Sequence, residues 1–500
     1  MRIGGAQFAG LAALFALAGC ASIGASSSPT ASNLDAIEGE LRAHIAILAS
    51  DEFEGRRPGT MGERKALRYL AETWQSAGLE TATNDPANPW FEPVELGLWA
   101  AESATAKFER KGTTVAIPDD AIALFASGRR ALIEDAPLQY VGRLGASLEQ
   151  SELAGRVAIM EWGHAGQIAQ REALLENGAA AVLAIIADDD DFAEIRQIRE
   201  KGAYRLSSDA DGSTLDGIIT AEAATALIGA RYAQLKSAAA QEGFRPQALD
   251  LVATLDATSS EAVVQTHNLI AKLPGRDPDA GVVLLMAHWD HFGQCLDESP
   301  DLPGQSDRIC NGAVDNASGL AVLTELAERL GAMRQMDRDI YFVATTAEEW
   351  GLLGARAFSR NPPIPLESII AGFNIDSIGV APRGGPVAIV GEGLTALDDE
   401  VKPIIAQTGR GMAGQAFAEL FVQRQDGWAL LQRDVPVLMV SSAFAQPDLM
   451  RRYARERYHM PSDEIDAVEL GGAAEDLLLH IDLVRHFANV ATFPQRPVVE

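Results

Sequence analysis

The sequence predicts an α/β protein whose central sheet is mainly parallel and covered by helices on both faces. Apolar runs of strand length alternate with helical patterns from residue 268 onward, at 282–287, 340–345, 371–375 and 435–440. Residues 319–330 have the spacing of a helix, with Leu320, Leu323 and Leu326 on one face. Strands that alternate with helices form such sheets, whose ligands bind beyond the carboxyl ends of the strands.

Length and composition set limits on the class of protein. A chain of 500 residues is too long for one ordinary core and predicts two or three domains. With 47% hydrophobic and 22% charged residues, the composition is that of a soluble globular protein. The formal net charge of −29 argues against nucleic acid or an anionic membrane as the main partner.

The N-terminus has the pattern of an export signal. Arg2 precedes an apolar segment at 8–18, and Leu-Ala-Gly-Cys follows, ending at Cys20. This ending resembles a bacterial lipobox, so we expect residues 1–19 to be a lipoprotein signal peptide, Cys20 to be lipidated and residues 20–33 to be a flexible tether. The apolar run is too short for a membrane span; the alternative is a plain signal peptide. The expected location is the periplasm or the outer membrane, with a lipid anchor as the one membrane contact.

The segments before residue 268 differ in character. Residues 34–78 read as two helices around a loop at 51–60, and 90–96 as a strand. From 99 to 258, short strands with Gly and Asp turns predominate, without a cluster of histidines and acids. The run of four aspartates at 188–191 is predicted to be a solvated loop, with a calcium site as the alternative.

Polar side chains gather where the predicted strands end. The first strand is followed by His288 and Asp290, the second by Glu348 and Glu349, and the third by Asp376. Two further candidates, which lie before a predicted helix and near the C-terminus, are Asp315 and His459. Two histidines and three carboxylates would suit two zinc-like ions bridged by one carboxylate. Taken singly, Asp315 could be a helix cap, the glutamate pair a solvated helix start and His459 a surface residue.

Five motifs carry a resemblance to a known family. AHWDHFG, NGAVDNASG, TTAEEWGLLG, FNIDSIG and YHMPSDE are similar to motifs of the di-zinc aminopeptidase family, which includes bacterial secreted aminopeptidases, glutamate carboxypeptidase II, glutaminyl cyclase and the transferrin receptor. LASDEFEGRRPGT resembles the opening of its secreted members, and SELAGRVAIMEWG resembles a protease-associated domain. The resemblance implies a zinc-exopeptidase-like catalytic domain formed by 33–98 and 259–500, interrupted by a β-rich protease-associated insert at 99–258.

The resemblance also implies roles for the metal ligands. His288 and Asp376 would bind one Zn²⁺ ion, and Glu349 and His459 the other. Asp315 would bridge both ions, with its peptide bond to the next residue cis in relatives.

Three further residues are expected to serve catalysis. Asp290 would orient His288, and Glu348 would be the general base, because the attacking water needs a carboxylate to take its proton. Tyr458 could donate to the oxyanion, with a purely structural tyrosine as the alternative.

One departure from the family pattern and several rival functions remain open. Gln425-Asp426-Gly427 stands where relatives often carry Ser-Asp-His, which puts the substrate pocket in question. A carboxypeptidase or dipeptidase would need a cationic clamp, for which there are four candidates: Arg383, Arg410, Arg424 and Arg433. Glutaminyl cyclase works with one metal and fits less well, and a receptor-like module would not need the complete ligand set.

The two cysteines outside the signal are expected to pair. Cys295 and Cys310 lie close in sequence, in a Gly-, Pro- and Asp-rich segment, and an oxidising compartment favours a disulfide. Two unpaired thiols are the alternative. The favoured function is that of an exported aminopeptidase acting on peptides; the sequence leaves side-chain preference and oligomeric state open.

Overall fold

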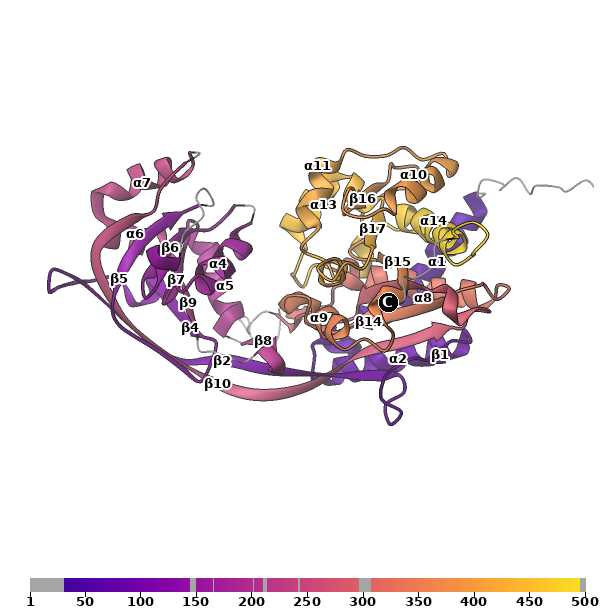
Figure 1. The fold of residues 1–500 in the computed structure, drawn as a ribbon, viewed down its shortest axis with the longest axis horizontal. Helices are drawn as coiled ribbons and strands as arrows, with labels where there is room; N and C mark the ends of the chain where they lie inside the picture. The colour runs from indigo at the N-terminus through magenta and orange to yellow at the C-terminus, as the bar shows by residue number, and fades with distance from the viewer. Residues whose placement is uncertain are drawn as a thin grey trace, which may run out of the picture.

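The computed structural model describes residues 31–143, 150–164, 166–200, 202–209, 214–241, 243–295 and 307–494. The predicted signal peptide, Cys20 and most of the predicted tether lie outside these ranges. Figure 1 shows two lobes side by side, joined by two long strands. Within the described ranges, none of the helices combines the length and apolar character that a bilayer span requires.

The larger lobe is built on the predicted α/β sheet. Its strands run in the order β16-β17-β15-β11-β14-β10, and the pairs from β17 to β14 are parallel, whereas β16 and β10 pair antiparallel. The strand bounds are β10 (Gln247–Leu273), β11 (Val282–His288), β14 (Asp339–Thr345), β15 (Ile369–Asn374), β16 (Ala388–Val390) and β17 (Val437–Ser441). The short strand β1 (Glu80–Thr81) pairs with β10, and β12 (Gly293–Gln294) and β13 (Ile309–Cys310) form a separate two-stranded antiparallel sheet.

Helices cover both faces of this sheet, as predicted. Val283 and Leu285 of β11 pack in one core with α1 (Ala31–Leu48), α2 (Met61–Ser76), α8 (Gly319–Gly331) and α14 (Gly471–Phe487). The alternate residues Leu284 and Met286 pack in another core with α9 (Leu353–Arg360) and α12 (Gly427–Leu431). Burial on both faces explains why these strands are continuous apolar runs. The other helices and turns of this lobe include η1 (Asp51–Arg56), η6 (Ala313–Ser318), η7 (Glu348–Trp350), α10 (Asp398–Gln407), α11 (Gln415–Ala418) and α13 (Pro447–Glu456).

The strands of the smaller lobe continue the same hydrogen-bonded sheet beyond β10, with helices on both faces. Strands β5, β6, β7 and β9 are parallel neighbours, and β4 closes the edge. The bounds are β3 (Thr113–Val115), β4 (Ile122–Ala126), β5 (Arg130–Gly142), β6 (Val157–Glu161), β7 (Ala181–Ile186), β8 (Ala203–Leu206) and β9 (Leu215–Thr220). The helices are α3 (Gln150–Leu153), α4 (Gln167–Glu176), α5 (Asp189–Glu200), α6 (Ala221–Ile228) and α7 (Tyr232–Ala239), with the short turn η3 (Ser207–Asp209). Strands such as β6 and β7 are buried on both faces, so this lobe contains more helix than its short strands had indicated.

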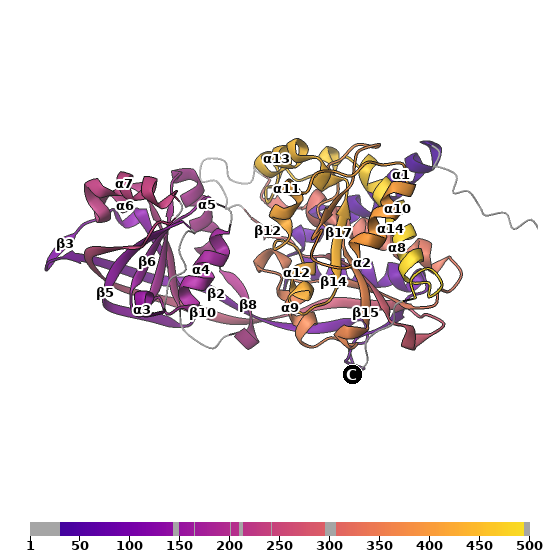
Figure 2. The same cartoon turned by 45° about the horizontal axis from the view of Figure 1, so that its top comes forward.

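Two long antiparallel strands connect the lobes. β2 (Phe91–Arg110) and β10 pair along most of their length, and both run from one lobe into the other (Figures 1 and 2). The predicted domain boundaries, at 98/99 and 258/259, fall inside these strands. The pairing register shifts between Thr258 and Ser259, at the second boundary. The division into two domains remains a prediction.

The acidic run at 188–191 begins a helix, which corrects the prediction of a solvated loop. Asp188 Oδ1 accepts hydrogen bonds from the amides of Asp190 and Asp191, at 2.9 and 3.2 Å. These contacts satisfy amides at the start of α5, where acidic residues are favoured. Among the described residues, the groups that could hold a metal ion do not include these aspartates.

Candidate metal centre

The carboxyl ends of β11, β14 and β15 meet at one edge of the larger sheet. His288 ends β11 and lies opposite Thr345, which ends β14. Glu348 and Glu349 follow β14 in η7, and Asp376 follows β15. The parallel sheet therefore brings together the side chains that the sequence placed after separate strands.

Asp315 lies between the two predicted ligand histidines. Its Oδ1 is 3.2 Å from His288 Nε2, and its Oδ2 is 3.4 Å from His459 Nε2. The peptide bond between Asp315 and Asn316 is cis. At the start of α8 the amide of Gly319 donates to Asn316 Oδ1 at 2.9 Å, so this side-chain contact comes from the neighbour of Asp315.

The remaining ligand candidates complete two groups around Asp315. His288 Nε2 lies 3.5 Å from Asp376 Oδ1. His459 Nε2 lies 2.9 Å from Glu349 Oε2. The structure thus brings all five predicted ligands together, as two histidine–carboxylate groups that share one aspartate.

The atoms of these groups fit divalent cations. Within the described part of the chain, the buried Nε2 atoms of His288 and His459 are not aligned for a hydrogen bond, although carboxylate oxygens lie 2.9–3.5 Å away. One ligand atom from each of His288, Asp315 and Asp376 lies within 4.8 Å of the others. Imidazole nitrogen with carboxylate oxygen is a donor set typical of zinc. The residues present therefore fit a pair of zinc ions.

Charges in the centre shift one another's pKa values. Burial opposes charging of His288, but Glu348 and two ligand aspartates raise its pKa well above the ordinary imidazole value. Burial also opposes charging of His459, yet Glu349 and Asp315 raise its pKa to about 9. Although burial and Asp315 would raise the pKa of Glu349, the nearby histidines lower it to about 2. The cluster favours positive charge at the positions where a metal ion would displace protons.

Glu348 has a different environment from the ligands. Its side chain lines a pocket beside the centre, together with Asp315 and Asp376. Desolvation raises its pKa well above the ordinary value, more than His288 lowers it. A raised pKa makes the carboxylate a stronger proton acceptor, as a general base requires.

Asp290 holds the backbone of the glutamate pair. Its carboxylate accepts from the amides of Glu348 and Glu349, at 3.1 and 3.4 Å. His288 Nδ1 is closer to the backbone carbonyl of Asp290, at 3.2 Å, than to its carboxylate, at 3.8 Å. Burial raises the pKa of Asp290 to about 8. Asp290 therefore links the loop after β11 to the turn after β14. It also lies next to His288, the residue that it was expected to orient.

The sequence reasoning missed His291, which is fully buried in the centre. Its Nδ1 lies 2.5 Å from Glu349 Oε1, and Asp315, Glu349 and His291 also form a group that could hold a metal. The signal was present, because this second histidine of AHWDHFG follows His288 by three residues. It orients Glu349 from the side opposite His459.

Arg56 is a second residue whose role was not foreseen. It is completely buried and donates to four backbone carbonyls, those of Leu48, Trp289, Asn311 and Gly312. Three of these carbonyls belong to the loops that carry His288 and Asp315. The only sequence signal was its place in LASDEFEGRRPGT, which was used for the resemblance alone.

Asp463, in the motif YHMPSDE, supports the same region. Its carboxylate accepts from the amides of Val314 and Asp315, both at 3.1 Å, and from the hydroxyl of Tyr453 at 3.0 Å. This contact ties the loop of His459 to the turn of Asp315. The motif therefore contributes a ligand and a support for the shared carboxylate.

A disulfide lies beside the centre. The structure joins Cys295 to Cys310, with their Cα atoms 5.7 Å apart. Gly55, with φ of 62°, packs against this segment: a Cβ at this position would lie 2.4 Å from the Cys310 carbonyl oxygen. Only glycine fits this close approach, so the opening motif and the cysteine segment are shaped to each other.

The pocket beside the centre is largely apolar. Arg424 and Tyr458 are among its polar lining residues, and Arg424 Nη2 lies 3.5 Å from the Tyr458 hydroxyl oxygen. The Tyr458 ring stacks on the His459 ring, with their centroids 3.6 Å apart. Among the four candidate clamp arginines, Arg424 alone lines the pocket. Its apolar lining comprises Phe417, Phe421, Met439, Phe444 and Met450.

The departure at 425–427 lies behind the pocket. Gln425 and Asp426 are buried and do not line it. Asp426 accepts a short hydrogen bond from Thr345, at the end of β14. Arg424, the residue immediately before this segment, lines the pocket.

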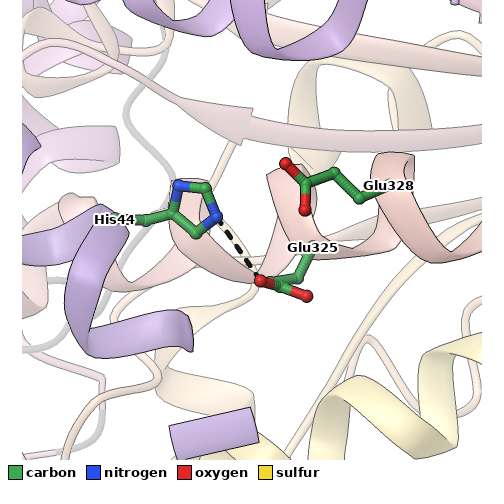
Figure 3. A group of neighbouring side chains, drawn as sticks. All are labelled: His44, Glu325 and Glu328. Atoms are coloured by element: carbon green, nitrogen blue, oxygen red, sulfur yellow. Dashed lines mark ion pairs between the residues drawn. The ribbon is translucent and has the colours of Figure 1, made fainter. Parts of the chain in front are cut away.

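A third group of potential ligands lies elsewhere. Figure 3 shows His44 directed at Glu325, with Glu328 beside them; His44 Nε2 is 3.4 Å from Glu325 Oε1. Arg329 Nε already donates to the other oxygen of Glu325 at 2.9 Å, and Tyr69 lies 2.6 Å from His44 Nδ1. These bonds link α1, α2 and α8, and we interpret the group as an ion-pair network between helices.

The fold and this ligand set are those of a metal-dependent hydrolase. Comparison with known proteins indicates which kind of hydrolase the chain resembles. Residues 268–480 match the model of peptidase family M28. The match spans residues 268–480 of the 500-residue chain and includes every predicted metal ligand.

Several known proteins are similar to this chain in sequence or in fold. The chain is 23% identical over 378 residues to the probable lipoprotein aminopeptidase LpqL of Mycobacterium tuberculosis, covering 74% of this chain and 65% of LpqL. It is 33% identical over 116 residues to the alkaline phosphatase isozyme conversion protein of Escherichia coli, covering 23% of this chain and 32% of that protein. The solved aminopeptidase from Aneurinibacillus sp. strain AM-1 shares the fold, with a TM-score of 0.57, 18% identity and coverage of 93% and 96%. The chain thus spans less than two thirds of either curated relative.

Proposed function

We propose that the protein is an exported di-zinc peptidase that removes N-terminal residues from peptides. The observation that carries the proposal is the position of Asp315 between two histidine–carboxylate groups, 3.2 and 3.4 Å from their imidazoles, with Glu348 beside it in the same pocket. Sharing of one carboxylate is what two closely spaced cations require.

The ligands divide between two ions in this proposal. His288 and Asp376 would hold one, Glu349 and His459 the other, and Asp315 both. Zinc ions bound there would supply Lewis-acid activation of a water molecule and of the peptide carbonyl. His291 would fix Glu349 in its ligand orientation, because it contacts the oxygen that does not face His459.

Glu348 is the proposed general base. It takes a proton from the water whose oxygen attacks the carbonyl carbon, and returns it to the amine as the C–N bond breaks. Asp290 keeps Glu348 in place through its amide. Tyr458 is the proposed donor to the oxyanion: burial raises its pKa well above the ordinary value, so its hydroxyl stays protonated.

The pocket indicates which side chain is removed. Its wall of phenylalanine and methionine side chains would bury an apolar side chain of the first residue. The carboxylates around the centre would hold the free amine of that residue. We therefore expect leucine and phenylalanine to be preferred over aspartate at the first position.

Arg424 favours a second candidate, a carboxypeptidase or dipeptidase. A guanidinium on the pocket wall, next to Tyr458, could bind the carboxylate of a short substrate. The two candidates differ in the substrate end that must be free, which makes them separable by blocked peptides.

The proposed location is the cell envelope, with Cys20 lipidated. LpqL, a relative by sequence, is named a probable lipoprotein aminopeptidase, which supports this part of the proposal. A mass spectrum of the membrane fraction with an acylated Cys20 at the new N-terminus is expected; a protein that keeps residues 1–19 would contradict it.

The test compares peptides with either end blocked. Zinc-loaded protein should cleave leucyl- and phenylalanyl-anilides and C-amidated dipeptides, and should not cleave their N-acetylated forms. The reverse pattern would establish the carboxypeptidase, and absence of cleavage would favour a receptor-like module. In the same assay Glu348→Gln should keep its metals but lose kcat by about a hundredfold or more; normal kcat would exclude Glu348 as the base.

A further inference from the structure

A short segment of the smaller lobe reaches the turn that carries Glu348 and Glu349. Strand β8 pairs with β2 through Leu98 opposite Tyr204, and this pairing brings Tyr204 to the larger lobe. Tyr204 is 4% exposed, and its ring packs edge-on against Trp350, with centroids 4.7 Å apart. Trp350 directly follows the glutamate pair in η7.

Three further contacts fix Tyr204 at this place. Its hydroxyl donates to the carbonyl of Pro58 at 3.0 Å and lies 3.2 Å from Arg57 Nε, which donates to it. The Arg57 guanidinium lies 5.2 Å from the Tyr204 ring and 5.3 Å from the Trp350 ring. Arg57 and Pro58 belong to the motif LASDEFEGRRPGT, so this motif meets the smaller lobe at the glutamate turn.

The contacts extend to a proposed metal ligand. Trp350 lies 5.2 Å from Phe292, and Phe292 lies 4.5 Å from His459, as measured between ring centroids. Tyr204 therefore contacts the turn of Glu348 directly, through Trp350. It is connected to the proposed ligand His459 through the rings of Trp350 and Phe292.

The turn itself has a backbone that needs external support. Ala347 and Leu352, on either side of it, have left-handed φ values of 51° and 60°, which non-glycine residues rarely adopt. Such conformations persist at functional sites where surrounding packing holds them. Tyr204 and Leu206 of β8 pack in one apolar cluster with Ala347 and Leu353.

Two hydrogen-bonded ion pairs next to β8 strengthen the contact between the lobes. Asp209, in η3, accepts hydrogen bonds from Arg356 and Arg360 of α9, at 2.8 and 2.5 Å. Helix α9 begins directly after the glutamate turn. Segment 203–209 thus contacts the glutamate turn through Tyr204 and helix α9 through Asp209.

We propose that segment 203–209 of the smaller lobe is a positioning element for the catalytic turn, with Tyr204 as its central residue. Tyr204 holds Trp350, and thereby fixes the backbone from which Glu348 and Glu349 project. The smaller lobe then contributes to turnover and to metal retention without a residue that touches substrate. This inference rests on the proposed function for its activity readout, but its structural readout is independent.

The test compares two buried tyrosines of the smaller lobe in the full chain. Tyr204→Ala removes the ring at the turn, Tyr204→Phe keeps it, and Tyr232→Ala removes a buried ring from the core remote from the turn. Hydrogen–deuterium exchange of metal-free protein is followed over residues 346–353. We expect clearly faster exchange there in Tyr204→Ala, a smaller increase in Tyr204→Phe, which keeps the ring but loses the hydroxyl contacts, and wild-type exchange in Tyr232→Ala.

With zinc-loaded protein, Tyr204→Ala should lower kcat by about tenfold to a hundredfold with little change in KM, as expected for a displaced catalytic group. Tyr204→Phe, which keeps the ring contact with Trp350, should lower kcat much less than Tyr204→Ala. Equal effects of Tyr204→Ala and Tyr232→Ala, or no change in the turn for Tyr204→Ala, would overturn the proposal. If wild-type protein cleaves no peptide, the proposed function fails, while the exchange of residues 346–353 still decides the positioning role.

Discussion

Replacement of Arg56 by methionine should destabilise the larger lobe and empty its metal centre. The guanidinium donates to the carbonyls of Leu48 and Asn311 at 2.7 Å, Trp289 at 2.9 Å and Gly312 at 3.1 Å. A hydrogen bond to a charged group contributes about 1.5–3 kcal/mol, and a buried carbonyl left without a partner costs about 1–3 kcal/mol. These contributions are not additive, because the lobe relaxes and because burial of the guanidinium is itself costly.

We therefore expect a loss of about 4 kcal/mol or more in the free energy of unfolding, a large share of the roughly 5–15 kcal/mol typical of folded domains. Guanidinium-chloride unfolding followed by tryptophan fluorescence measures it, and mass spectrometry measures the metal content. Arg56→Lys keeps the charge but has three donors for four carbonyls, so an intermediate loss is expected.

Arg64→Met is the matched control for this prediction. Arg64 lies on the exposed side of α2, eight residues from Arg56, and its replacement should change stability by no more than about 0.5 kcal/mol. If Arg56→Met unfolds within about 1 kcal/mol of wild type and binds a full complement of metal, Arg56 does not hold the two loops together.

Two more predictions concern the same edge of the sheet. Asp315→Asn should bind clearly fewer than two metals per chain and lose activity, because a neutral amide replaces the anion shared by two cations; its helix content should be unchanged, since Asn316 and not Asp315 accepts from the first amide of α8. Full occupancy with full activity in this variant would refute the shared-ligand arrangement. Unreduced exported protein should contain no alkylatable thiol at Cys295 or Cys310, as the disulfide in the structure implies; two alkylated cysteines in a peptide map would show that the bond does not form in the cell.

The sequence predicted the parts of the centre that depend on local patterns. Apolar runs located β11, β14 and β15, and the parallel-sheet rule placed the residues after these strands at one edge, so five ligands from distant parts of the chain were proposed together. The sequence allowed Asp315 to be a ligand or a helix cap; only the structure shows that Asn316, not Asp315, accepts from the first amide of α8.

The missed features depend on contacts between segments far apart in sequence. Arg56 bonds to carbonyls more than 230 residues away, and carbonyls leave no trace in the amino-acid sequence. The pairing of β8 with β2, which takes Tyr204 to the glutamate turn, likewise depends on the path of two long strands. The helices of the smaller lobe were underestimated because its short apolar strands can belong to either a β-rich or an α/β unit.

The bonding of Arg56 also explains how the centre keeps its anionic oxygens available. Several carboxylates are buried around Asp315, and buried charges without partners are costly. An arginine that formed a bidentate pair with Asp315 would neutralise it, but would occupy the oxygens that a metal ion needs. Arg56 instead donates to backbone carbonyls, while its positive charge still acts on Asp315, Asp290 and Glu349. Arg56 thus offsets part of the negative charge without bonding to the carboxylates. Their oxygens remain directed at the histidines. Two divalent cations would balance the negative charge that remains, which is a physical reason to regard the site as built for them.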